Sequence, residues 1–152
     1  LFSLAGLVAA GRLAQAVLTN GPTFAFDGQF HVDALSACLV VLTSFVALTT
    51  ALYSGPYLAR EQVNGRMTAP RRRLYHAMYQ LFLFTMLVAL TTDNLGLLWV
   101  AMEAATLATA LLVSVYRTPA SLEAAWKYFI LCGVGVAQAL LGTVLLYMAA
   151  EK

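Results

Sequence analysis

The sequence contains few charged residues: Asp, Glu, Lys and Arg make up 11% of its 152 residues, whereas 61% are hydrophobic. Soluble globular domains carry about 25% charged residues, so this composition excludes an ordinary soluble domain. The apolar residues form long runs along the whole chain and leave no segment large enough for a separate soluble domain. The sequence therefore predicts one membrane domain covering residues 1–152.

Cysteine is also scarce, and Cys38 and Cys132 lie far apart in separate apolar runs. Neither has a close Cys or His that would complete an iron–sulfur, nickel or zinc site. The sequence lacks a phosphate-binding loop, and it lacks a Ser or Cys nucleophile accompanied by a base. Gly133 and Gly135 lie inside an apolar run, where they favour close helix packing rather than dinucleotide binding. We expect no cofactor, no metal and no catalytic centre in this chain.

The apolar runs predict an all-α fold, a polytopic bundle of transmembrane helices. A lipid-facing β-barrel would alternate apolar and polar residues, which these runs do not, and a bilayer requires each helix to pair its own backbone groups. Asp33, Asn94 and Ser121 are expected to mark helix starts, and Ser54-Gly55-Pro56 to end or kink the second span. The five predicted spans are residues 1–19, 34–58, 74–91, 95–116 and 122–148.

Basic residues are concentrated in one predicted loop. Residues 59–73 carry five Arg against the single acid Glu61, whereas residues 20–31 and 92–94 carry no Lys or Arg. The excess of basic residues in cytoplasmic loops predicts that residues 59–73 are cytoplasmic, and residues 117–121 then lie on the same side. This placement accounts for most of the basic residues, so we expect no nucleic acid partner.

Glu103 lies near the middle of the fourth predicted span, where an ionisable side chain costs roughly 2.5 kcal/mol or more. It shares a face with Thr106, Ala110 and Ser114, and small residues on both faces predict a helix enclosed within a bundle. One interpretation is a protonated carboxyl group satisfied by a neighbouring helix. The other, which we favour, is a proton or ion relay, because movement of a nearby cation would shift the carboxyl pKa and load or release a proton.

Lys127 is the second candidate charge for proton translocation. It shares a face with Glu123 and Gln138, which suggests a hydrated path, although Glu123 and Lys127 also have the spacing of a helical ion pair and the lysine is close enough to the surface to snorkel. His76 lies at the inner end of the third span beside Tyr75. Interfacial anchoring and proton shuttling are both open roles for this histidine.

Five motifs along the chain are informative together: Val32-Asp33-Ala34-Leu35-Ser36, Tyr53-Ser54-Gly55-Pro56-Tyr57, Phe82-Leu83-Phe84-Thr85-Met86, Asp93-Asn94-Leu95 followed by Glu103, and Ser121-Leu122-Glu123-Ala124-Ala125-Trp126-Lys127-Tyr128-Phe129. They resemble the antiporter-like membrane subunits of respiratory complex I, Mrp-type antiporters and group 4 membrane-bound hydrogenases. Within this family the motifs are most similar to the hydrogenase 4 component F branch, which is associated with formate hydrogenlyase-type complexes.

The resemblance implies a subunit that translocates protons, with sodium as the alternative ion, coupled to electron transfer in other subunits of a bacterial inner-membrane complex. Glu103 matches the buried glutamate of the family and Lys127 a lysine of the following span, whereas Met102 stands where a Trp is common. The family has about fourteen spans, and the lysine that partners the glutamate lies in a later, broken helix, so we expect this chain to be the amino-terminal fragment of a longer protein.

The sequence therefore predicts the amino-terminal part of a proton-translocating, non-redox subunit of a hydrogenase or NADH dehydrogenase type complex. Two other hypotheses stay open. An unrelated secondary transporter would have a substrate site at a repeat interface with discontinuous spans. A structural membrane anchor would tolerate loss of the Glu103 carboxyl group.

Overall fold

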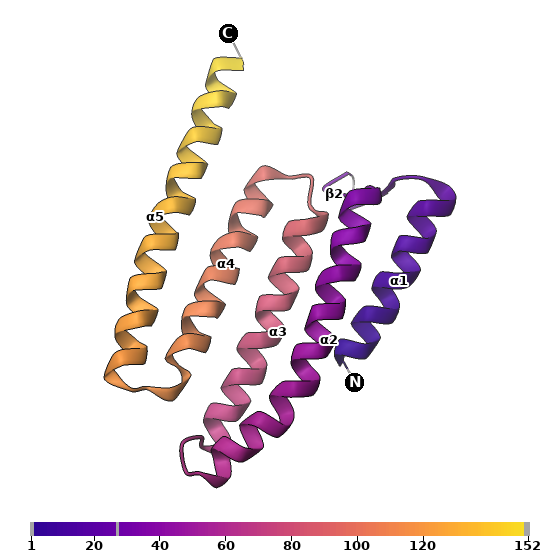
Figure 1. Cartoon of the computed structure of the whole chain (residues 1–152). Helices are drawn as coiled ribbons and strands as arrows, with labels where there is room; N and C mark the ends of the chain where they lie inside the picture. Colours follow the sequence, from indigo (N-terminus) through magenta and orange to yellow (C-terminus); the bar gives the residue numbers. More distant parts are fainter. Residues whose placement is uncertain (1, 27, 151–152) are drawn as a thin grey trace.

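In the computed structural model, which describes residues 2–26 and 28–150, five long helices lie side by side in chain order (Figure 1). Each helix packs mainly against the helices that precede and follow it. A short 3₁₀ helix, η1 (Ser114–Tyr116), follows the fourth long helix. The all-α prediction is confirmed. The long helices are α1 (Phe2–Asn20), α2 (Ala34–Val63), α3 (Ala69–Thr91), α4 (Leu95–Val113) and α5 (Pro119–Ala150).

Four of the described helical segments are long and apolar enough to cross a membrane. They are α2, α3, α4 together with η1, and α5. The chain is therefore an integral membrane protein. Helix α1 is not among the four. The first predicted span thus forms a helix, and its membrane crossing stays a prediction.

Side chains at three helix starts explain where the helices begin. The Asp33 carboxylate accepts the Ser36 backbone N–H at 2.7 Å, a bond that lowers the pKa of this carboxyl group below its usual value. Asn94 caps α4 in the same way, so both predicted caps are confirmed. The Ser121 prediction was wrong by three residues: Thr118 and Ser121 exchange reciprocal bonds of 3.0 and 3.1 Å, and α5 begins between them at Pro119 instead of at residue 122.

A small β-hairpin lies between α1 and α2, in a segment for which the sequence predicted only a loop. Strand β1 (Thr23–Ala25) pairs antiparallel with β2 (Phe30–Val32), and the rings of Phe24 and His31 stack at 4.6 Å. The Gln29 carbonyl accepts the Asp93 backbone N–H at 2.9 Å. The hairpin is therefore held against the α3–α4 connection. Strands this short carry little periodicity, which is why the sequence pattern did not reveal them.

Helices α2 and α3 extend beyond the predicted spans. Helix α2 continues through Pro56 to Val63 rather than ending there, and Figure 1 shows that it bends toward its carboxyl end. The proline ring cannot donate to the Leu52 carbonyl, and loss of this bond is a known cause of bending. Helix α3 begins at Ala69, so the basic residues 71–73 lie in its first turns.

The connections fall at the two ends of the row of helices (Figure 1). The α2–α3 and α4–α5 connections lie at one end, and the hairpin and the α3–α4 connection lie at the other. This alternation agrees with the predicted threading. The carboxyl-terminal part of α5 extends beyond the neighbouring end of α4, as expected for a helix of 32 residues beside one of 19.

Candidate functional site

Helix α4 positions Glu103 by packing through small side chains. Ala101, Ala105, Ala108 and Ala110 are all at least nine-tenths buried, and Ala108 is fully enclosed. Small residues allow neighbouring membrane helices to approach closely. The Asn94 side chain fixes the start of the helix by accepting the backbone N–H groups of two residues in the first turn, at 2.9 and 3.1 Å. Glu103 is the ninth residue after this cap, about 12 Å along the helix.

Glu103 is half-buried, and its carboxyl group has no hydrogen bond or ion pair with any other residue in the described part of the chain. The nearby hydroxyl groups do not donate hydrogen bonds to the Glu103 carboxyl group. Thr106 donates to the Met102 carbonyl at 2.9 Å and Thr109 donates to the Ala105 carbonyl at 2.9 Å. The carboxyl group therefore lies midway along a membrane-length helix without a partner from residues 2–26 or 28–150.

An apolar cavity of about 230 Å³ lies between α4 and α5, one turn from Glu103 toward the α4–α5 connection. Its lining includes Leu107 and Ala110 from α4 and Trp126 and Phe129 from α5. Ser114 supplies a hydroxyl group, but this group donates to the Leu111 carbonyl at 3.0 Å. The cavity offers little to hold a chain of water molecules beside Glu103.

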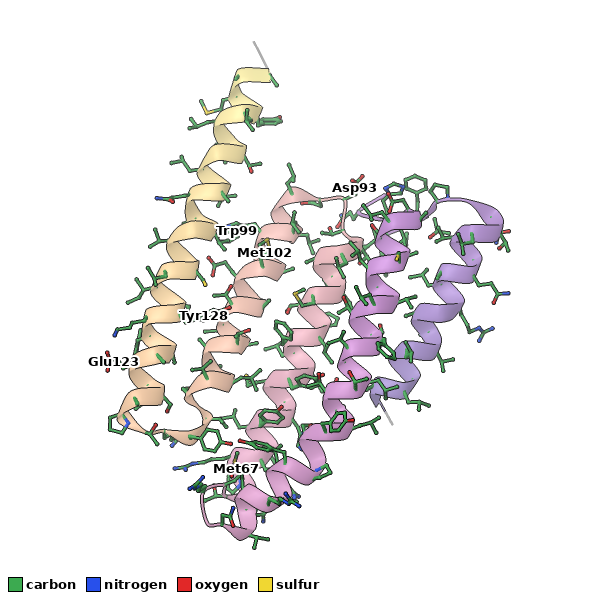
Figure 2. The ribbon with its side chains drawn as sticks, in the orientation of Figure 1. Met67, Asp93, Trp99, Met102, Glu123 and Tyr128 are labelled. Atoms are coloured by element: carbon green, nitrogen blue, oxygen red, sulfur yellow. The ribbon has the colours of Figure 1, made fainter. Side chains whose placement is uncertain are left out.

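Lys127 forms an ion pair with Glu123 on its own helix rather than with Glu103. Both side chains are about two-thirds exposed. Figure 2 shows Glu123 on the side of α5 that faces away from α4. The predicted helical ion pair is therefore present, and the structure does not bring Lys127 to the Glu103 carboxyl group.

The remaining predicted path residues lie apart from Glu103. His76 is exposed on α3, where its ring meets that of Tyr75 edge-on at 5.5 Å. Gln138 is exposed on α5. Neither residue contacts Glu103 or Lys127 through a hydrogen bond within residues 2–26 and 28–150. A continuous path through these residues stays a prediction.

A tryptophan joins the amino-terminal half of α4 to α5. The Trp99 indole Nε1–H donates to the Val136 carbonyl at 3.2 Å, and the two helices border a cleft of about 420 Å³. Met102 and Thr106 line this cleft from α4, and Figure 2 shows Trp99 and Met102 on the part of α4 that faces α5. The sequence showed a tryptophan at this position but gave no sign that it bonds to the backbone of the next helix.

A cleft of about 240 Å³, which the sequence pattern did not reveal, lies between α1, α2 and α3. Its polar lining residues are Ser3, Thr43, Ser44 and Gln80, and Ser44 is 6% exposed. Thr49 and Ser54 on α2 donate to carbonyl groups of their own helix. Thr43 and Ser44 have no such bond within the described residues. Only contacts among three helices reveal this grouping, because the four residues share no local motif.

A polar cleft, here called the arginine cleft, lies at the end of the bundle where α2 meets α3. It has a volume of about 580 Å³. The Tyr57 and Tyr116 hydroxyl groups are 3.2 Å apart, and Arg71 Nη1 donates to the Tyr116 carbonyl at 3.5 Å. The sequence predicted the basic loop but not this cleft. Its lining residues are Tyr57, Glu61, Gly65, Arg66, Arg71, Tyr116, Thr118 and Ser121.

The acidic, histidine and cysteine side chains of the described residues do not form a group of three that could hold a metal ion. Cys38 on α2 and Cys132 on α5 are both free thiols. The side chains at the candidate site are thus a carboxyl group on α4 and an ion pair on α5, a set suited to proton transfer rather than to covalent chemistry.

Comparison with known proteins finds a protein family that part of this chain matches. Residues 92–152 match the family described as NADH:quinone oxidoreductase/Mrp antiporter, transmembrane region. The matched residues begin at the α3–α4 connection and include both Glu103 and Lys127.

Three relatives are similar to this chain in sequence. The hydrogenase-4 component F homolog of Methylacidiphilum infernorum is 53% identical over 80% of this chain, NADH-quinone oxidoreductase subunit L of Mycobacterium tuberculosis is 34% identical over 80%, and subunit N of Herminiimonas arsenicoxydans is 33% identical over 97%. The chain spans only 26%, 18% and 30% of the length of these relatives, respectively.

Proposed function

Because this chain is a relative of the antiporter-like membrane subunits of hydrogenase 4 and NADH-quinone oxidoreductases, we propose that it forms part of a proton-translocating membrane subunit. Other subunits of the complex would carry out electron transfer, and this subunit would couple that reaction to ion movement. The chain itself supplies helices and ionisable side chains rather than a redox centre.

The observation that supports this proposal is the Glu103 carboxyl group. It lies at the middle of α4, half-buried and without a hydrogen bond or ion pair from the described residues. An isolated carboxylate at this depth of a membrane is unfavourable. Approach of a cation would stabilise the carboxylate and favour release of a proton, and withdrawal of the cation would favour proton uptake.

Lys127 has a secondary role in this scheme. Its ammonium group is already paired with Glu123 and lies on α5, so it does not serve as the direct partner of Glu103. Rearrangement of this ion pair would nevertheless change the field at α4, because charges in a membrane interior are weakly screened. We propose that Glu123, Gln138 and His76 contribute to proton entry or exit rather than to the central switch.

We place the subunit in the bacterial plasma membrane, with residues 59–73 on the cytoplasmic side. The support is the excess of arginine in this segment. The α4–α5 connection, which carries Arg117, lies at the same end of the bundle as this segment. The partners would be membrane and peripheral subunits of a hydrogenase or complex I-like assembly.

The test replaces Glu103 in the full-length protein within its assembled complex. Glu103→Gln keeps the size of the side chain but removes the titratable group. Proton translocation, measured in sealed vesicles, should fall by about a hundredfold or more, the lower range for loss of a positioned proton-transfer group. Glu103→Asp keeps a carboxyl group and should retain part of the activity.

A structural anchor gives a different result. If Glu103→Gln assembles and translocates protons as well as the unaltered protein, the proposed role is wrong and the anchor hypothesis stands. Subunit composition and electron-transfer rate, measured on the same preparation, separate loss of coupling from loss of assembly. Sodium dependence of the remaining activity would instead favour sodium as the ion.

A further inference from the structure

We propose that the arginine cleft binds the phosphate headgroup of an anionic glycerophospholipid. The proposal rests on the shape, charge and position of this cleft and not on proton translocation. Nothing in the role of Glu103 requires it, so the two proposals succeed or fail separately.

The lining of the cleft is rich in hydrogen-bond donors. Arg66 and Arg71 supply guanidinium groups, and Tyr57 and Tyr116 supply hydroxyl groups. The contacts of the two arginines are long: Arg66 lies 3.9 Å from the Glu61 carboxylate and Arg71 lies 3.5 Å from the Tyr116 carbonyl. A guanidinium group has five N–H donors in a planar fork that matches phosphate oxygens. Each arginine therefore keeps donors available for a phosphate.

The charge around the cleft also favours an anion. Glu61 is the carboxylate in its lining, and it lies beside Arg66. Arg60 and Arg73 are exposed on the adjoining helix ends, and Arg117 is exposed at the α4–α5 connection. Basic pockets between membrane helices are known sites for anionic lipid headgroups. The surplus of positive charge would attract such a lipid before the cleft binds it.

The position of the cleft selects a lipid rather than a soluble phosphate compound. The cleft lies where α2 ends and η1 follows α4, at the end of membrane-length helices. Leu52 and Tyr53, one to two turns before Tyr57 on α2, are 65% and 80% exposed. Acyl chains would contact this apolar surface while the headgroup occupied the cleft. Tyrosine is itself common at the boundary between hydrocarbon and headgroups.

The experiment measures lipid retention by the full-length protein in its complex. The protein is purified in detergent, supplied with dioleoyl phosphatidylglycerol or dioleoyl phosphatidylcholine, and analysed by native mass spectrometry. The cleft variant is Arg66→Gln/Arg71→Gln. Its matched control is Arg60→Gln/Arg73→Gln, which removes the same charge from exposed positions outside the cleft.

Phosphatidylglycerol should be retained by the unaltered protein and by the control. The cleft variant should retain it about twenty-fivefold less, since each basic residue near an anionic lipid contributes a factor of about five and the variant removes two. Glu61→Gln should increase retention, because it removes the carboxylate that opposes the phosphate. If the cleft variant is unstable, single Arg66→Gln, at an exposed side chain, should still reduce retention severalfold.

Three results would overturn the proposal. Equal loss in the cleft variant and the control would show general charge attraction instead of a site. Equal retention of phosphatidylcholine would show that the anionic headgroup is not recognised. Displacement of the lipid by millimolar inorganic phosphate would show that the cleft binds a soluble anion and not a lipid.

Discussion

Helices α4 and α5 are neighbouring apolar helices, but they differ in whether their ionisable side chains have a partner. Helix α4 packs between α3 and α5 and holds Glu103 without a partner from the described residues. Helix α5 packs against α4 and η1, buries only Ala125 among its described residues, and pairs Glu123 with Lys127 on its own surface. A charge that its own helix neutralises needs nothing further. A half-buried acid without such a partner is stabilised in a membrane by a proton or by the approach of a cation.

The largest expected difference between the two helices is in packing. Ala108 on α4 is fully enclosed, so Ala108→Leu should lower the free energy of unfolding of the full-length protein by about 2 kcal/mol, as expected for overpacking. Ala137 is exposed on α5, and Ala137→Leu should change the free energy of unfolding little. The thermal unfolding midpoint in detergent measures both effects. An equal loss in the two variants would show that α5 is as enclosed as α4 and would break the comparison.

The second difference concerns the ion pair. Lys127→Gln should lower proton translocation by about fivefold, equivalent to about 1 kcal/mol in the barrier, because it removes the cation of α5, the helix that packs against α4. Glu123→Gln leaves that cation in place and should have a smaller effect. Vesicle translocation assays on the assembled complex measure both.

Equal and small effects of Lys127→Gln and Glu123→Gln would show that the pair only anchors α5. Exposed helical pairs of this kind stabilise a protein by about 0.3–0.5 kcal/mol. The thermal unfolding midpoint should therefore stay nearly constant in both variants. A large fall in this midpoint would mean that the pair supports the fold, and the translocation result would then need a different explanation.

Most of the helical architecture follows from hydropathy alone. A bilayer enforces helices wherever an apolar run is long enough, and caps such as Asp33 and Asn94 are local signals. Helix ends were predicted less well. Residues 59–63 and 69–73 are rich in charged side chains and follow or precede an apolar run, and hydropathy cannot show that the helical backbone continues into them.

The candidate site was only partly predictable. The depth of Glu103 and the spacing of Glu123 and Lys127 are properties of single helices, and the sequence shows both. The Trp99 bond to Val136, the grouping of Ser44 with Gln80 and the arginine cleft depend on which faces of different helices meet. No spacing rule within one segment contains that information.

The third test addresses the start of α4. Asn94→Ala removes the side chain that accepts the N–H groups of Gly96 and Leu97, and it should lower the free energy of unfolding by about 1 kcal/mol. Asn94→Asp should preserve most of the stability, because a carboxylate can accept the same bonds. The thermal unfolding midpoint is the measurement. No change in Asn94→Ala would show that neighbouring helices hold this turn without the cap.

The smallest effect concerns the bond that joins the two helices. Trp99→Phe keeps an aromatic ring but removes the Nε1–H donor to the Val136 carbonyl, and the free energy of unfolding should fall by about 0.6 kcal/mol, the average for interhelical bonds in membranes. Trp126 is 64% exposed on α5 and meets Phe129 edge-on, with no hydrogen bond from its indole to a described residue. Trp126→Phe is therefore the matched control and should leave the unfolding midpoint almost unchanged. If both variants lose the same stability, ring size rather than the hydrogen bond is responsible, and α4 is joined to α5 by packing alone.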